Sequence, residues 1–199
     1  MIKAILFDLD GVLVDACDWH YHALNEALKD CGYKKIEYSD HMTLYNGLPT
    51  SKKLEMLNID KNDRKKIWEL KQSKTLNTIM KFGKVDKYKQ RMHSQLKNMG
   101  LHIVCVTNSI RKTATEMLKV TGQLEYMDFL ISNEDVEKNK PHPDCYELAF
   151  KKLKLKKEEC LIIEDSEKGI ESAKRSGANI QKVDDVYDVT LDLIISRLK

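Results

Sequence analysis

The sequence predicts an α/β fold in which a doubly wound parallel sheet carries an inserted all-helical module. Short apolar runs typical of buried strands alternate with helical patterns at the start of the chain and again from residue 85 onward. Between them, residues 16–83 show helical spacing and no β-rich run. Strands separated by helices form parallel βαβ units, so we expect a Rossmann-like sheet. Residues 1–15 and 84–199 would form the α/β core, and residues 16–83 the helical module.

The individual elements follow from where the spacing changes. The expected strands are Ile2–Leu9, Leu101–Val106, Phe129–Ile131, Cys160–Ile163 and Ile180–Val183. The expected helices of the core are Tyr88–Met99, Lys112–Val120, Asp144–Leu153, Ile170–Arg175 and Leu191–Leu198. In the inserted module, Asp18 is a candidate N-cap of the first helix and Gly32 a candidate stop.

Composition excludes several classes of protein. The 199 residues carry a net charge of +3, and the lysines are interleaved with acids, so no nucleic-acid-binding surface is indicated. No apolar run approaches the roughly 18 residues of a membrane span, and the N-terminus does not resemble a signal peptide. Five cysteines without a CxxC pair indicate reduced thiols. We expect a cytoplasmic protein with no nucleic-acid or membrane partner, as a monomer or weak homodimer.

Two carboxylates stand directly after the first apolar run. Side chains alternate along a strand, so Asp8 and Asp10 are predicted to point to the same side, at the carboxyl end where open α/β sheets place their ligands. Like charges in that place need a cation or a shared proton, and oxygen ligands favour Mg²⁺. The competing interpretation is an ordinary Asp10-Gly11 turn with Asp8 as a stray acid.

The other polar clusters also follow apolar strands. They are Thr107-Asn108-Ser109, then Lys140 in a proline-bounded loop, then Glu164-Asp165. In a doubly wound sheet these strand ends lie side by side. Carboxylates, one lysine and hydroxyl or amide donors suit a Mg²⁺-bound phosphoryl group. Thr107 and Ser109 could instead cap the following helix, Ser109 more readily than Thr107, and Ser166 could cap its own helix.

The four clusters, in this order, resemble the motifs of the haloacid dehalogenase superfamily, and the insertion resembles its helical cap. The chain is most similar to the branch of β-phosphoglucomutase and sugar-phosphate phosphatases. The resemblance implies that Asp8 attacks phosphorus to form an aspartyl-phosphate and that Asp10 is the acid and base. It also implies phosphate binding by Thr107, Asn108 and Lys140. Mg²⁺ would be bound by Asp8, the Asp10 carbonyl and Asp165. Glu164 would be either a further ligand or a hydrogen-bond acceptor that does not itself contact the metal.

The resemblance also places possible substrate contacts in the cap. His20 stands where β-phosphoglucomutase has a histidine, and Thr50 stands near the register of its phosphate-gripping arginine. Lys52 or Lys53 could replace that arginine, but a lysine does not reproduce its bidentate grip. We therefore predict a phosphatase acting on a small phosphorylated metabolite. The alternatives are a phosphomutase and, less favoured, a phosphonate hydrolase or a non-catalytic binding protein.

Overall fold

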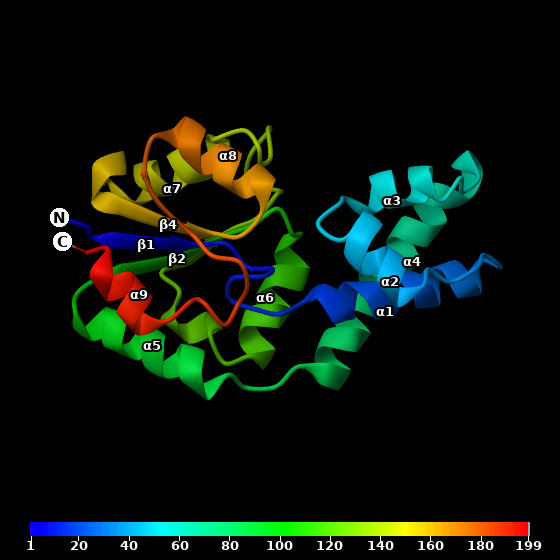
Figure 1. Cartoon of the computed structure of the whole chain (residues 1–199), viewed down its shortest axis with the longest axis horizontal. Coiled ribbons are helices and arrows are strands. Elements are labelled where there is room, and N and C mark those ends of the chain that lie inside the picture. Colours follow the sequence, from blue (N-terminus) through cyan, green and yellow to red (C-terminus); the bar gives the residue numbers. More distant parts are fainter. Residues whose placement is uncertain (199) are drawn as a thin grey trace. The chain divides into compact units, whose positions relative to one another are not determined.

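The computed structural model of the chain describes residues 1–198. The chain forms two compact units, Met1–Asp15 with Lys84–Lys199, and Ala16–Gly83. Figure 1 shows strands in the first unit and helices alone in the second. Each unit is described separately below.

The first unit is built on a parallel sheet of five strands in the order β3-β2-β1-β4-β5. The strands are β1 (Ala4–Phe7), β2 (His102–Val106), β3 (Phe129–Ile131), β4 (Cys160–Glu164) and β5 (Asn179–Lys182). β1 is central, and its Phe7 is aligned with Cys105 of β2 and Ile163 of β4. The predicted α/β fold class is confirmed.

Helices cover both faces of this sheet. They are α5 (Lys87–Asn98), α6 (Arg111–Val120), α7 (Asp144–Leu153), α8 (Glu167–Ser176) and α9 (Leu191–Ser196), with short 3₁₀ turns at Leu124–Tyr126 (η2) and Lys157–Glu159 (η3). Alternation along the strands divides the core. Ala4 and Leu6 of β1 pack toward Tyr146 of α7 and Ala173 of α8, whereas Phe7 contacts His93 of α5. Figure 1 shows α7 and α8 on one face and α5 on the other.

The first strand is shorter than predicted. β1 ends at Phe7 rather than Leu9, although the Asp8 amide still donates to the carbonyl of Ile163 at 3.0 Å. The chain then closes a tight loop, in which Gly11 has φ of +83° and the Val14 amide donates to the Leu9 carbonyl at 2.9 Å. Asp8 and Asp10 therefore lie beyond the strand, and alternation does not set their directions.

The second unit is helical throughout. Its elements are α1 (Cys17–Asp30), α2 (Tyr38–Asp40), a π-helical turn η1 (His41–Tyr45), α3 (Thr50–Met56) and α4 (Lys61–Phe82). Its core joins Leu24 and Leu28 of α1 to Ile67 of α4. The predicted cap at Asp18 is wrong, because α1 already begins at Cys17 and the Asp18 carboxylate accepts a hydrogen bond from the Tyr38 hydroxyl at 2.9 Å. The stop near Gly32 is confirmed, with α1 ending at Asp30.

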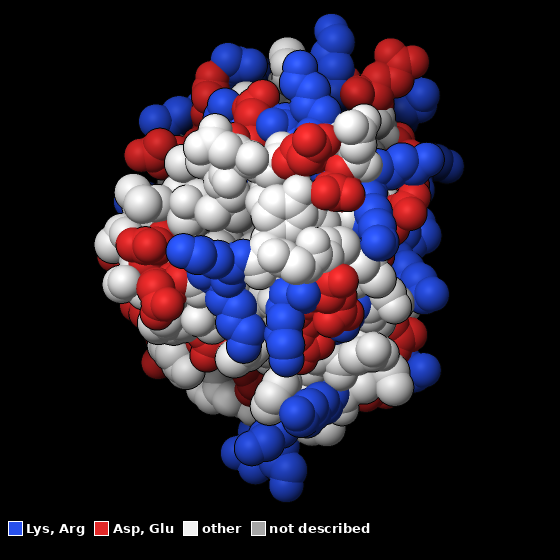
Figure 2. All heavy atoms as spheres, turned by 90° about the vertical axis from the view of Figure 1, so that its right-hand side faces the viewer, with Lys and Arg blue, Asp and Glu red and all other residues white. Residues whose placement is uncertain are grey.

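Charges of both signs are mixed on the surface. In the helical unit Lys74 pairs with Asp30 at 2.7 Å and Lys52 with Glu55 at 2.8 Å. Figure 2 shows basic and acidic side chains interspersed over the face that it presents. Exposed pairs of this kind contribute little to stability. Among the described residues, no helix is long and apolar enough to cross a membrane.

A buried polar network holds the loop that follows β1. The Gln123 side-chain amide donates to the carbonyl of Leu13 at 3.0 Å and to the Thr121 hydroxyl at 3.0 Å. Its oxygen must therefore accept from Nε2 of His93, 2.9 Å away. His93 is fully buried, and burial lowers its pKa from 6.5 to about 4. The loop carrying Asp10 is thus held through a histidine whose burial favours the neutral form.

Acid should weaken this network. The unfolded chain takes up a proton on His93 near pH 6.5 and the folded chain only near pH 4, so stability falls as pH falls through that window. The difference corresponds to about 3 kcal/mol. We expect His93→Gln to lose less stability than wild type between these two pH values, as measured by urea unfolding. The exposed His102→Gln variant is the control, and it should follow the wild-type curve; equal curves for all three proteins would contradict this role.

Candidate active site

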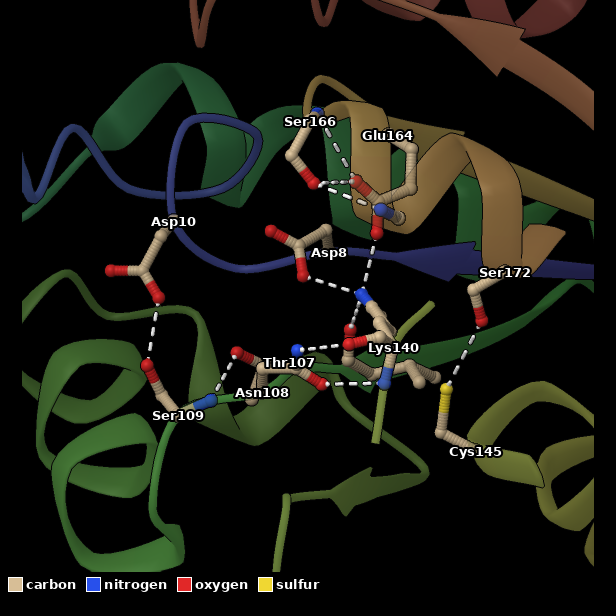
Figure 3. A network of polar contacts seen from close by, with 12 residues as sticks. Asp8, Asp10, Thr107, Asn108, Ser109, Lys140, Cys145, Glu164, Ser166 and Ser172 are labelled. Atoms are coloured by element: carbon tan, nitrogen blue, oxygen red, sulfur yellow. Dashed lines mark hydrogen bonds and ion pairs between the residues drawn. The ribbon is translucent and has the colours of Figure 1, made fainter. Parts of the chain in front are cut away.

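A buried lysine joins the ends of three strands. The Lys140 ammonium donates to Asp8 Oδ1 at 2.7 Å, to Glu164 Oε1 at 2.5 Å and to the Val106 carbonyl at 2.8 Å. Asp8 follows β1, Val106 ends β2 and Glu164 ends β4. Figure 3 shows the ammonium between the two carboxylates. The structure therefore brings together the predicted residues Asp8, Lys140 and Glu164.

Asn108 fixes the loop that carries this lysine. Its side-chain amide donates to the Lys140 carbonyl at 3.1 Å, and its oxygen accepts from the Lys140 amide at 3.1 Å. Two reciprocal hydrogen bonds determine the position of the Lys140 backbone. The Asn108 side chain therefore has a positioning role that the sequence did not indicate.

Asp10 is held by a hydroxyl rather than by the lysine. Ser109 Oγ donates to Asp10 Oδ2 at 2.8 Å, and Figure 3 shows the Asp10 side chain directed toward Ser109. The interpretation of Ser109 as a cap of the next helix is wrong, and so is the alternative in which Thr107 caps it. The N-cap of α6 is Ile110, which makes no side-chain capping bond, and Thr107 Oγ1 accepts from the Ser109 amide at 3.0 Å. The two hydroxyls thus order the turn after β2.

Three carboxylates gather closely enough to share a cation. One oxygen each from Asp8, Glu164 and Asp165 lies within 4.8 Å of the others. Asp165 Oδ1 is buried and accepts no hydrogen bond from the described residues. Gly11 makes room for this group, because a Cβ there would stand 2.2 Å from Asp165 Oδ2. The predicted metal contribution of Asp10 is through its carbonyl, and its carboxylate is not part of the cluster.

Burial and charge shift the pKa values of these groups. Burial, together with Glu164, Asp10 and Asp165, raises the pKa of Asp8 well above its ordinary value, while the charge of Lys140 opposes the rise. Burial alone would lower the pKa of Lys140, but Asp8 and Glu164 raise it well above 10.5, so Lys140 is charged. Burial and Glu164 raise the pKa of Asp165 to about 6. One ammonium among these carboxylates leaves a surplus of negative charge that a divalent cation would offset.

Two residues that support Glu164 could not be recognised in the sequence. The Tyr146 hydroxyl of α7 donates to Glu164 Oε1 at 2.8 Å, and the Lys140 ammonium lies 5.1 Å from the Tyr146 ring centre. At Gly169 of α8, a Cβ would meet the Glu164 carboxylate at about 2 Å. A tyrosine at helical spacing signals only a core position. Ser166 is the N-cap of α8, as expected, accepting from the Gly169 amide at 3.1 Å.

The predicted cap residues all lie in the helical unit. His20 is on α1, where its Nδ1 lies 3.1 Å from the ammonium of the buried Lys71. Thr50 is the first residue of α3, and Lys53 of the same helix is buried. Their contact with a substrate remains a prediction.

Comparison with known proteins identifies the family. The model of the haloacid dehalogenase-like hydrolase family matches residues 5–183. The chain belongs to this family. The predicted superfamily is therefore confirmed.

Relatives match over most of their length. PpaX of Caldanaerobacter subterraneus subsp. tengcongensis is 32% identical over 88% of this chain and 79% of that protein. A phosphorylated carbohydrates phosphatase of Thermotoga maritima is 26% identical over 88% of this chain and 82% of its own. The β-phosphoglucomutase of Bacillus subtilis is 26% identical over 88% of this chain and 80% of that protein.

The fold also matches a solved structure. The crystal structure of β-phosphoglucomutase from Clostridium difficile superposes with a TM-score of 0.80 and covers 100% of this chain and 97% of that one. Its sequence is 22% identical, so the likeness concerns the fold.

Removing the Tyr146 hydroxyl should lower the free energy of unfolding of the protein. Tyr146→Phe leaves the buried Glu164 carboxylate with one donor fewer, and a hydrogen bond to a charged group contributes about 1.5–3 kcal/mol. We expect a loss of stability of that order in urea unfolding. Tyr187→Phe, at a side chain that is 79% exposed, is the control and should have no effect. Equal stability of the two variants would contradict the role of Tyr146.

Proposed function

We propose that the protein is a Mg²⁺-dependent phosphatase that hydrolyses a small phosphate monoester through an aspartyl-phosphate on Asp8. Support comes from membership in a hydrolase family and from relatives named as phosphatases. The observation that carries the proposal is the Asp8 carboxylate, held at Oδ1 by Lys140 beside two further carboxylates. A carboxylate at the carboxyl end of the central strand is well placed for attack on a bound phosphate.

The carboxylate cluster fits Mg²⁺ on chemical grounds. Asp8, Glu164 and Asp165 supply oxygen ligands, which Mg²⁺ prefers, and the buried Asp165 Oδ1 is an acceptor that a cation would satisfy. Asp8 and Asp165 are the better candidates, because Lys140, Tyr146 and Ser166 already donate to Glu164. When bound, the ion would offset the charge of the phosphoryl oxygens.

The protein groups divide the chemistry among them. Because Lys140 occupies Oδ1 of Asp8, Oδ2 is available to attack phosphorus and form the phosphoryl ester. The Asp10 carboxyl would give its proton to the leaving oxygen and then take one from the attacking water, with Ser109 holding it. The Thr107 hydroxyl and the Asn108 backbone N–H would donate to phosphoryl oxygens, and the Lys140 charge would stabilise them.

The helical unit would act as the cap that selects the substrate. Its ends fall at residues 15–16 and 83–84, where two chain connections could act as a hinge. Lys53 and Lys71 are buried in this unit beside His41 and His20 respectively, so the cap carries basic groups suited to an anionic metabolite. A screen of phosphorylated metabolites for inorganic phosphate release would identify the substrate.

Loss of the nucleophile should abolish turnover. We expect Asp8→Asn to lower Mg²⁺-dependent hydrolysis of an aryl phosphate by more than about a thousandfold, because an amide oxygen is a poor nucleophile. The Asp184→Asn variant, at a side chain of the same unit that is 87% exposed, should keep its activity. Removing Mg²⁺ with a chelator should stop turnover, and adding it back should restore it. Wild-type protein that hydrolyses no phosphate ester with Mg²⁺ would refute the proposal.

A phosphomutase is the second candidate, because one relative is named a β-phosphoglucomutase. Thr50 at the start of α3 does not offer an arginine grip for a distal phosphate, which favours the phosphatase. We expect incubation with β-glucose 1-phosphate and a bisphosphate primer to yield no glucose 6-phosphate by transfer. Formation of glucose 6-phosphate without release of phosphate, followed by phosphorus NMR, would reverse this choice.

A further inference from the structure

Three side chains of the helical unit form a cluster that has no role in the proposed phosphatase mechanism. Cys17, the first residue of α1, places its Sγ 3.4 Å from Nε2 of His41 and 3.5 Å from Sδ of Met42. All three residues belong to Ala16–Gly83, so the cluster is internal to that unit. A thiol, a thioether and an imidazole together are a soft set of metal ligands, unlike the oxygen ligands around Asp8.

The imidazole of this cluster is fixed in place. His41 is buried, and its ring packs against Tyr21 with centres 5.1 Å apart. Its Nε2 lies 3.4 Å from the Cys17 sulfur, so one metal ion could contact both atoms. An imidazole nitrogen is a common metal ligand.

The backbone that presents His41 and Met42 is unusual. His41–Tyr45 forms a π-helical turn, closed by the hydrogen bond from the Asn46 amide to the His41 carbonyl at 2.7 Å. Such turns are rare and occur frequently at functional sites. Neighbouring residues of a helix point in different directions, yet here both contact one sulfur. The turn thus brings two ligand groups to the Cys17 sulfur.

We propose that Cys17, His41 and Met42 form a binding site for a soft monovalent metal ion, Cu(I). Ligands about 2.0–2.3 Å from an ion lie about 3.5–4 Å apart in a three-coordinate arrangement. The separations of Cys17 Sγ from the other two ligand atoms, 3.4 and 3.5 Å, are close to this. Met42 is 45% exposed and can move by the few tenths of an ångström required. On binding, the Cys17 S–H bond breaks, a sulfur–copper bond forms and the proton passes to solvent, with no change of oxidation state. The thioether selects Cu(I) over Zn²⁺ and Mg²⁺.

Competition titration tests this site directly. Cu(I), supplied anaerobically as its acetonitrile complex, is titrated into the full chain against a chromophoric Cu(I) chelator. We expect wild type to withdraw one equivalent, and Cys17→Ser and Met42→Leu to bind at least about tenfold more weakly, since even groups outside the ligand shell of a metal are worth that factor. X-ray absorption of the copper-loaded wild type should show two sulfur ligands and one nitrogen.

Matched variants within the same unit provide the controls. Cys31 is also half-buried, and Met56 is 42% exposed against 45% for Met42. Cys31→Ser and Met56→Leu should bind Cu(I) as wild type does. The proposal fails if Cys31→Ser weakens binding as much as Cys17→Ser, if Met42→Leu has no effect, or if Zn²⁺ displaces the bound copper. Met42 is exposed, so its variant tests the site without disturbing the core.

Discussion

The buried ammonium of Lys140 is the interaction on which the α/β unit depends. It joins a loop after β1, the last carbonyl of β2 and the final residue of β4, so three strand ends are fixed around one charge. A buried ion pair is costly to desolvate and is tolerated when further hydrogen bonds satisfy its members. Asn108 and Tyr146 supply such bonds, to the Lys140 backbone and to Glu164. The remaining negative charge of the carboxylates would attract a cation. A bound cation would in turn attract an anion.

The sequence is sufficient to predict the architecture and several of the residues that gather at the candidate site. Short apolar runs mark the strands, and ligands bind at the carboxyl ends of parallel strands, which is enough to place Asp8, Lys140 and Glu164 in one site. The predicted end of β1 lies two residues too late, because an apolar run does not reveal where the loop around Gly11 begins. The interpretation of Ser109 as a cap is wrong because capping is a local signal, whereas its bond to Asp10 spans 99 residues.

Supporting residues are harder to predict because they depend on packing between distant segments. Tyr146 reaches Glu164 only because α7 lies on the same face of the sheet as α8. Gly169 looks like a weak helical residue until the Glu164 carboxylate is placed beside it. In the helical unit, the contact of Cys17 with His41 depends on a π-helical turn that no sequence pattern signals. Residues at strand ends can therefore be placed in one site from the sequence, but side-chain contacts that depend on helix packing cannot.

The central position of β1 has a consequence for the nascent chain. Ala4 pairs with His102 and Cys160, so β1 waits until more than 150 further residues have been synthesised before both of its neighbours exist. At 5–20 residues per second, this wait lasts roughly 10 to 30 s. The helical unit, a continuous segment, needs no such wait. During the delay the apolar strand lies between Lys3 and the pair Asp8 and Asp10, and charges that flank an apolar segment oppose aggregation. The two aspartates thus oppose aggregation of the nascent chain before the site that contains them has formed.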